Sequence, residues 1–128
     1  MAEKNKILLI DDEKDFLGLV RERLEMEGYE IITALNGEEG VAKAKSENPD
    51  LIICDIKMPM MDGYEVLKKV RQDQENRTPF IMLTAYGDFD NLKKAYEEEG
   101  DFFVTKPVKL EKLVKNVKSL LNLTKNRT

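Results

Sequence analysis

The sequence has no histidine and a single cysteine among its 128 residues. Without histidine the chain lacks the commonest general base and metal ligand, and any phosphohistidine chemistry must use a histidine of another protein. One thiol cannot form an internal disulfide, and Cys54 stands inside an apolar run, so we interpret it as a packing residue and not as a redox group. The chemistry of the chain must therefore come from carboxylates, hydroxyls and lysines.

Long apolar runs and a surplus of basic residues are also missing. The longest apolar runs, such as KILLI and LIIC, are far too short to cross a bilayer, and the N-terminal MAEKNK has no secretory segment, so we expect a cytoplasmic protein. The formal net charge is −4, which argues against direct nucleic-acid binding, because contacts with phosphates need clustered lysine and arginine. The length predicts one domain, residues 1–128, with its core over about residues 5–123 and no second domain.

Short apolar runs alternate with polar stretches of helical spacing. Continuous apolar strands are buried on both faces, which is typical of a parallel sheet with helices on either side. The pattern therefore predicts a doubly wound α/β domain with five parallel strands. The expected strands are Lys6–Ile10, Glu30–Ala34, Leu51–Asp55, Phe80–Thr84 and Phe102–Thr105.

Acidic and hydroxyl side chains stand at the ends of these strands. Asp11 and Asp12 follow the first strand, Asp55 ends the third, Thr84 ends the fourth, and Lys106 follows the fifth. Right-handed crossovers place every loop that follows a strand at one edge of a parallel sheet, so these residues meet there. With the strand order 2-1-3-4-5, the ligand crevice lies between strands one and three. We predict that the three carboxylates share this crevice.

Three carboxylates at one place favour a bound cation. Like charges about 4 Å apart repel by roughly 4 kcal/mol at an effective dielectric constant near 20. Oxygen ligands with room for waters favour Mg²⁺ over softer metals. Lys106 adds one more positive charge, so that the three carboxylates, Mg²⁺ and the ammonium are together neutral. Such neutralisation is what phosphoryl transfer needs.

Four motifs stand at the ends of the right strands and in the right order: DD, DIKMPMMDG, TAYGD and VTKP. Together they resemble the signature of the response-regulator receiver domain, of the CheY-like superfamily, over nearly the whole chain. The chain is most similar to stand-alone phosphorelay receivers of the sporulation type. The resemblance implies a flavodoxin-like fold with strand order 2-1-3-4-5 and five helices. It also implies a phosphorylated switch of a two-component system or phosphorelay, which is not an enzyme although it assists its own phosphorylation and dephosphorylation.

The resemblance assigns roles to residues that match the motifs. It implies that Asp55 is the phosphoacceptor and, with Asp11 and Asp12, a ligand of Mg²⁺. Lys57 resembles the residue that lends its backbone carbonyl to the metal. Lys106 resembles the lysine that pairs with the phosphoryl group.

Further roles concern switching and the lifetime of the acyl phosphate. Thr84 resembles the hydroxyl that moves to the phosphoryl group, and Phe103 stands at the position of the switch aromatic. Lys57 and Tyr86 stand two positions beyond Asp55 and Thr84 and flank the path of attacking water, so we expect them to set the hydrolysis rate. The donor implied by the resemblance is a histidine kinase or histidine phosphotransferase. The downstream protein is expected at the fourth helix, fifth strand and fifth helix.

Simpler interpretations stand beside these roles. Asp11 and Asp12 are also favoured helix N-caps, Asp62 predicts an N-cap for the helix after it, and Asp62–Gly63 is typical of a turn. We interpret the methionines at positions 58, 60 and 61 as packing residues. The resemblance implies a cis bond at Lys106–Pro107, whereas the sequence alone favours trans.

Other classes of protein share parts of this pattern. A haloacid-dehalogenase-like phosphatase also uses an aspartate and Mg²⁺, but it places two acids in a DxD run after one strand. A flavodoxin needs glycine and hydroxyl donors for the flavin phosphate where this chain has acids. A receiver excised from a hybrid histidine kinase stays open from the sequence.

Overall fold

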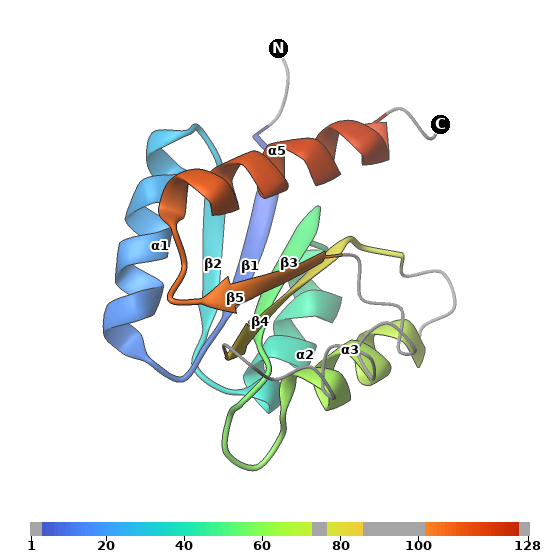
Figure 1. Cartoon of the computed structure of the whole chain (residues 1–128). Helices are drawn as coiled ribbons and strands as arrows, with labels where there is room; N and C mark the ends of the chain where they lie inside the picture. The colour runs from blue at the N-terminus through green and yellow to red at the C-terminus, as the bar shows by residue number, and fades with distance from the viewer. Residues whose placement is uncertain (1–3, 73–76, 86–101, 126–128) are drawn as a thin grey trace.

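The computed structural model describes residues 4–72, 77–85 and 102–125 (Figure 1). Strands and helices alternate from residue 6 to residue 85, and one further strand and one further helix are described within residues 102–125. The segments between these ranges and at the two ends are not described further. In chain order the elements are β1 Lys6–Ile10, α1 Lys14–Met26, β2 Glu30–Ala34, α2 Gly37–Glu47, β3 Leu51–Asp55, α3 Gly63–Gln72, β4 Phe80–Ala85, β5 Phe102–Lys106 and α5 Leu110–Lys125.

The described strands form one parallel, five-stranded sheet in the order β2-β1-β3-β4-β5. This order and the alternation with helices confirm the predicted flavodoxin-like, doubly wound α/β fold. Three strands have the predicted bounds, whereas β4 and β5 each continue one residue further because Ala85 and Lys106 are still paired in register. As predicted, β1 and β3 are neighbours, so the loops that follow them share the switch point of the sheet.

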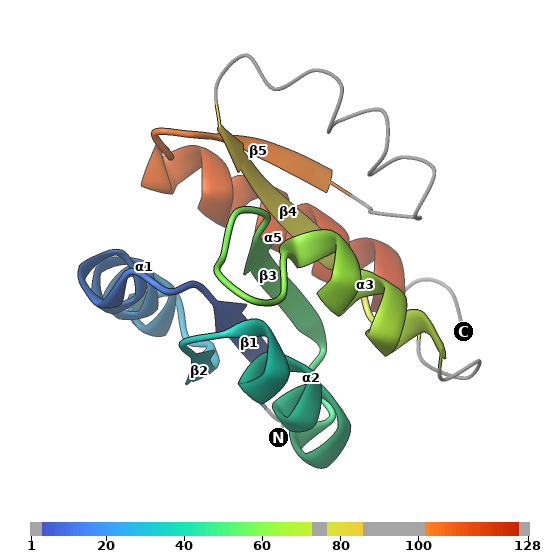
Figure 2. The same cartoon turned by 90° about the horizontal axis from the view of Figure 1, so that it is seen from below.

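Alternate residues of each strand face opposite sides of the sheet, and helices cover both sides (Figure 2). Ile7 and Leu9 of β1 belong to a core formed with α1 and α5, which we call the α1/α5 core. Leu8 and Ile10 belong to a second core formed with α2 and α3, the α2/α3 core. Burial on both faces explains the continuous apolar runs, because each fully buried leucine or isoleucine contributes about 1.5–3 kcal/mol.

The ends of the described helices follow local chemistry that the sequence contains. Gly28 follows α1 at φ 95°, the left-handed conformation that glycine adopts without steric cost. Asn48 ends α2 with φ 49°. The Asp62 side chain accepts a hydrogen bond of 2.9 Å from the Glu65 N–H, and the Glu65 carboxylate accepts one of 3.4 Å from the Asp62 N–H. This reciprocal pair is a capping box and confirms the predicted N-cap of α3.

Helix α5 packs its apolar stripe against the sheet as its periodicity predicts. The buried members of the stripe are Leu113, Val114, Val117, Leu120 and Leu121. The fifth expected helix lies between β4 and β5, in residues 86–101, and so outside the described residues. Within the described parts of the chain, no helix has the length and apolar character needed to cross a bilayer.

The loop between β3 and α3 differs from the prediction at one residue. Met58 is 9% exposed and Met61 packs against the α2/α3 core, as predicted for packing residues. Met60 is 92% exposed, so the prediction is wrong for this side chain. The backbone of Met60 has φ 69°, in the left-handed region. Methionine rarely adopts this conformation, so the sequence does not predict it.

Candidate functional site

The acidic cluster predicted from the strand ends is present at the carboxyl edge of the sheet. Asp11 follows β1 directly, and its N–H donates a hydrogen bond of 3.1 Å to the Ala34 carbonyl, which extends the β1–β2 pairing by one residue. Asp55 is the last residue of β3. Carboxylate oxygens of Asp11, Asp12 and Asp55 all lie within 4.8 Å of one another. Asp11 and Asp55 are 1% and 6% exposed, whereas Asp12 faces solvent.

Lys106, the last residue of β5, extends its ammonium into this cluster. Its Nζ donates a hydrogen bond of 3.2 Å to the Asp11 carboxylate and lies 3.4 Å from Oδ2 of Asp55. A third carboxylate oxygen, on the exposed Glu13, lies 3.8 Å away. The ammonium therefore stands between the two buried carboxylates, although 95 positions of sequence separate Asp11 from Lys106.

Burial and charge shift the protonation of this cluster. Burial raises the pKa of Asp55 to about 6, the charge of Asp11 acts in the same direction, and the nearby Lys106 acts against both. Burial also raises the pKa of Asp11, although the Glu13 N–H and Lys106 oppose it. Burial lowers the pKa of Lys106, but the charges of Asp11 and Asp55 outweigh it and the pKa is raised. One ammonium thus leaves the two buried carboxylates incompletely neutralised.

This donor set fits Mg²⁺. Three carboxylates offer oxygen ligands only, and one of them, Asp12, is open to solvent, which leaves room for the waters that Mg²⁺ retains. The raised pKa of Asp55 marks the place where a further positive charge is favourable. The cluster can therefore hold a divalent cation through carboxylates delivered by two neighbouring strands.

The alternative interpretation of Asp11 and Asp12 as simple helix caps accounts for part of the geometry. The N-cap position of α1 is occupied by Glu13, whose side chain makes no capping hydrogen bond. Oδ1 of Asp11 accepts a hydrogen bond of 3.0 Å from the Glu13 N–H, while Oδ2 accepts from Lys106. Asp11 thus uses one oxygen to fix the start of the helix and the other within the acidic cluster.

The backbone that carries Asp55 is held from two sides. The Ile56 N–H donates to the Leu83 carbonyl of β4 at 3.0 Å, and the Gly63 N–H donates to the Ile56 carbonyl at 2.8 Å. A Cβ atom on Gly63 would lie 2.7 Å from the Asp55 carbonyl oxygen and 2.8 Å from Cα of Ile56. Gly63 is therefore more than the turn residue that the sequence suggests, because the start of α3 rests directly on the backbone of the phosphoacceptor candidate.

Other predicted site residues are placed less completely. Thr84 is buried in β4, paired in register with Thr105. Lys57 has an exposed side chain directly beyond Asp55 and Ile56, and its role as a carbonyl ligand stays a prediction. The backbone of Phe103 lies in β5, but its side chain falls outside the described part, as does the whole of Tyr86. The Lys106–Pro107 bond is cis, as the resemblance implies.

Two neighbours of Lys106 did not follow from the sequence. The sequence motifs assign no role to Glu13, which follows the acidic pair. The run of three acids, DDE, was a signal that could have indicated it. Phe16 fits the apolar stripe of α1, yet its ring centroid lies 4.6 Å from Nζ of Lys106. Nothing in a helical stripe indicates which of its members borders a site on the adjoining strand ends.

A doubly wound sheet with three clustered aspartates and the Lys106 ammonium at its carboxyl edge agrees with the receiver class that the sequence motifs resemble. The chain belongs to the response regulator receiver domain family, whose family model matches residues 7–118. The chain is 42% identical over 120 residues to the transcriptional regulatory protein ResD of Bacillus subtilis, covering 94% of this chain and 49% of that protein.

Solved structures agree with this assignment. A CheY-like response regulator receiver domain protein from Methanospirillum hungatei superimposes with a TM-score of 0.91 at 30% identity, covering 98% of this chain and 100% of that one. The receiver domain of a signal transduction histidine kinase from Syntrophus aciditrophicus superimposes with a TM-score of 0.89 at 35% identity, covering 97% and 94%. The chain spans about half the length of the curated relatives it matches.

Proposed function

We propose that this receiver domain accepts a phosphoryl group on the carboxylate of Asp55 from a phosphohistidine of a partner protein. The observation that carries the proposal is the position of one ammonium, on Lys106, 3.2 Å from Asp11 and 3.4 Å from Asp55 within a cluster of three carboxylates. This arrangement has a nucleophile, a place for a divalent cation and a fixed positive charge at one edge of the sheet. Phosphoryl transfer depends on such positioning and charge neutralisation.

The reaction is a displacement at phosphorus. A carboxylate oxygen of Asp55 forms a bond to phosphorus while the bond between phosphorus and the donor histidine nitrogen breaks. The electron pair of that bond stays with the nitrogen. The imidazole leaves neutral when its other ring nitrogen carries a proton, and otherwise it becomes neutral by taking up one proton from solvent. The product is an acyl phosphate, which adds negative charge beside Asp11. The ammonium of Lys106 partly neutralises this charge.

Asp11, Asp12 and Asp55 are the residues that would hold Mg²⁺, with the backbone carbonyl of Lys57 as a further predicted ligand. When bound, the cation supplies Lewis-acid neutralisation of the phosphoryl oxygens. Asp55 itself provides the nucleophile, and Lys106 orients the phosphoryl group by charge. Within the same proposal the Thr84 hydroxyl moves to the phosphoryl group and Phe103 rotates inward, which couples phosphorylation to the surface near β5.

The partners belong to the proposal as well. A histidine kinase or histidine phosphotransferase is the expected donor, because the chain has no histidine of its own. ResD and the other relatives are named as transcriptional regulators, but they are about twice as long as this chain, so the absence of nucleic-acid contact stays a prediction from its charge. Residence in the cytoplasm and a role as a non-enzymatic relay of the sporulation type complete the proposal.

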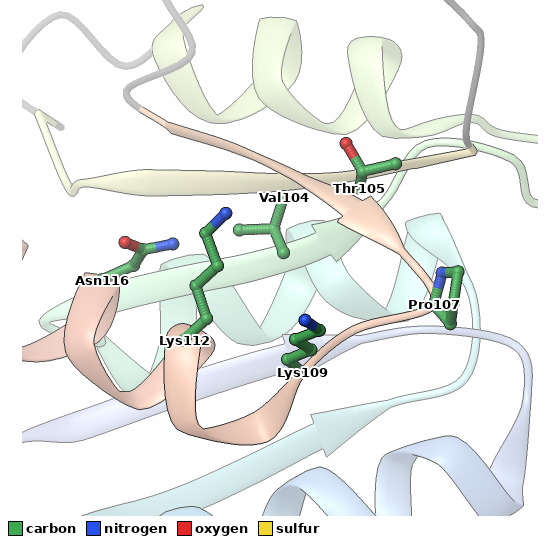
Figure 3. A pocket seen from close by; sticks show the side chains of 6 residues that line it. All are labelled: Val104, Thr105, Pro107, Lys109, Lys112 and Asn116. Atoms are coloured by element: carbon green, nitrogen blue, oxygen red, sulfur yellow. The ribbon is translucent and has the colours of Figure 1, made fainter.

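The downstream protein is proposed to bind where β5 and α5 meet. A groove of about 240 Å³ lies there, and Figure 3 shows the side chains of two lysines along its α5 side. Residues on both sides of Lys106 in the sequence line the groove, so a change at the acidic cluster has a short path to it. Its lining residues are Val104, Thr105, Pro107, Lys109, Lys112 and Asn116.

Replacing the nucleophile tests the proposal. Asp55→Asn is nearly isosteric but a poor nucleophile, so we expect it to abolish phosphorylation by acetyl phosphate or a phosphorylated kinase while the fold is kept. Intact-mass spectrometry with and without Mg²⁺ measures the result, and EDTA is expected to stop labelling of the wild type. A single phosphate on the Asp55→Asn chain, mapped to another acid, refutes Asp55 as the acceptor. Asp50→Asn, an exposed acid at the opposite edge of the sheet, is the matched control.

A further inference from the structure

The ammonium of Lys106 lies over an aromatic ring. Its Nζ atom is 4.6 Å from the ring centroid of Phe16, within the roughly 6 Å at which a ring face attracts a cation. We propose that Phe16 is a positioning residue, whose ring keeps the Lys106 ammonium at the acidic cluster before and after the site is loaded. The inference rests on the proposed function of Asp55, but its geometric part can be tested without phosphorylation.

The ring has a fixed place in the fold. Phe16 lies in the first turn of α1, and the start of this helix is held by the hydrogen bond from the Glu13 N–H to Asp11. The half-buried ring packs against the α1/α5 core. The Phe16 side chain thus contacts both the core and Lys106, whose side chain is 23% exposed. Partial removal of the ammonium from water strengthens its attraction to the ring.

The other neighbours of the ammonium are less suited to hold it in every state. Asp11 and Asp55 lie closest, but a cation or a phosphoryl group in the site shares the oxygens of these two residues. Glu13 is 66% exposed, so water and salt screen its charge. The ring of Phe16 has neither charge nor a ligand atom, so it does not compete for the cation. Of the four described neighbours of Lys106, it is the one whose contact is independent of what the carboxylates bind.

Phe16 could also be explained as a residue that only fills the core. The two roles separate by substitution. Phe16→Leu keeps apolar packing but removes the ring face, whereas Phe16→Tyr keeps the ring. Val20→Ala is the matched control, because it removes buried volume from the same helix and the same core without approaching Lys106. Unfolding by urea ranks the stability of all variants, so that rates are compared under conditions where each is folded.

The first measurement is NMR spectroscopy of the full chain without metal. A ring near Nζ shifts the Lys106 Hε protons upfield, and nuclear Overhauser effects are expected between these protons and the Phe16 ring. We expect the upfield shift to disappear in Phe16→Leu and to persist in Phe16→Tyr and Val20→Ala. In the wild type the Overhauser effects should persist when Mg²⁺ and beryllofluoride, an analogue of the phosphoryl group, are added. Their loss on loading overturns the proposal without any variant, even if Phe16→Leu fails to fold.

The second measurement is the rate of acyl phosphate formation from acetyl phosphate with saturating Mg²⁺. Phe16→Leu is expected to be about three- to tenfold slower than wild type, and Phe16→Tyr and Val20→Ala to stay within about twofold. A rate for Phe16→Leu equal to that of Val20→Ala assigns Phe16 to packing alone and refutes the positioning role. If Asp55→Asn is still phosphorylated, the proposed function fails, whereas the Overhauser effects judge the ring and ammonium contact independently.

Discussion

At the scale of single residues, the carboxylate of Asp55 is held in a place that disfavours its charge. Its pKa is raised to about 6 from an ordinary value of 3.8 by burial and by the charge of Asp11. The folded chain therefore binds the proton more tightly than the unfolded chain does. Without metal, ionisation of Asp55 lowers the free energy of unfolding as the pH rises from about 4 to about 6, and the loss is complete above that window.

The loss of stability on ionisation of Asp55 leads to a prediction for the metal-free protein. In EDTA at about pH 7.5, Asp55→Asn should be more stable than wild type by about 1–2 kcal/mol, because the amide removes a buried charge while Lys106 keeps Asp11 as a partner. Near pH 4 the difference should vanish, and Mg²⁺ at pH 7.5 should stabilise wild type more than the variant. Urea unfolding followed by circular dichroism measures these differences. A stability difference that does not change between pH 4 and pH 7.5 contradicts the stated cause.

We also predict that single side chains set the lifetime of the proposed acyl phosphate. Lys57 is exposed beside Asp55, and its ammonium can pair with phosphoryl oxygens without acting as a base for water. Tyr86, beyond the described residues, is expected to shield the phosphorus. We predict a long-lived phosphorylated state compared with fast chemotaxis-type receivers, and faster decay in Lys57→Asn and Tyr86→Glu.

Decay of the purified phosphoprotein on a phosphate-affinity gel measures this lifetime. Lys69→Asn, an exposed lysine in the last turn of α3, serves as the control for loss of charge alone. If Lys57→Asn and Tyr86→Glu both decay at the wild-type rate, these side chains do not control the access of water.

The convergence of the site residues could be predicted from the sequence, but their neighbours could not. The meeting of Asp11, Asp55 and Lys106 follows from the rule that all strands of a parallel sheet present the same edge. The approach of Phe16 to Lys106 depends on how α1 packs across the sheet, which is decided by side chains far from the motif. Met60 is exposed and has a φ angle in the left-handed region, which its residue type does not indicate.

At the scale of secondary-structure elements, the start of α3 and the end of β3 are in direct contact. We predict that Gly63→Ala lowers the free energy of unfolding by about 1–3 kcal/mol, because its Cβ would press on the backbone of Asp55 and Ile56. Phosphorylation should slow as well, since the carboxylate moves with its backbone.

Gly18 offers the opposite case on α1. A Cβ atom there meets nothing within 4 Å, so Gly18→Ala should raise the free energy of unfolding by about 0.5–1 kcal/mol through the better helix propensity of alanine. Urea unfolding of both variants compares the two glycines. Equal effects of the same sign would show that helix propensity, and not contact with Asp55, decides the outcome at Gly63.

The sequence predicted the bounds of the five strands to within one residue, because strands buried on both faces are continuous apolar runs. The sequence did not predict the last residue of β4 or of β5, because Ala85 and Lys106 extend the two strands by pairing with each other. Such pairing is a property of two strands together, and neither run of sequence shows it alone.

At the scale of the whole molecule, the thiol of Cys54 reports on opening of the fold. The residue is 0% exposed within the α2/α3 core, and burial together with the charges of Asp55 and Asp11 raises the pKa of the thiol well above its ordinary value. We predict no reaction with Ellman's reagent in native buffer over minutes and one thiol per chain in concentrated guanidinium chloride. Fast, stoichiometric labelling of the native protein would place Cys54 at the surface and contradict the packing described for β3.

Asp11 and Lys106 are 95 positions apart in the sequence, so the parts of the site are synthesised at different times. During synthesis the three aspartates leave the ribosome well before β5. The edge of β4 that pairs with β5 therefore has no strand partner until β5 has been made. Until β5 pairs, the carboxylates have no ammonium from Lys106 to offset the charge of an incoming phosphoryl group. If Asp55 accepts a phosphoryl group as proposed, we expect a chain whose β5 is not yet paired to accept it more slowly than the complete sheet, because the charge of Lys106 is missing.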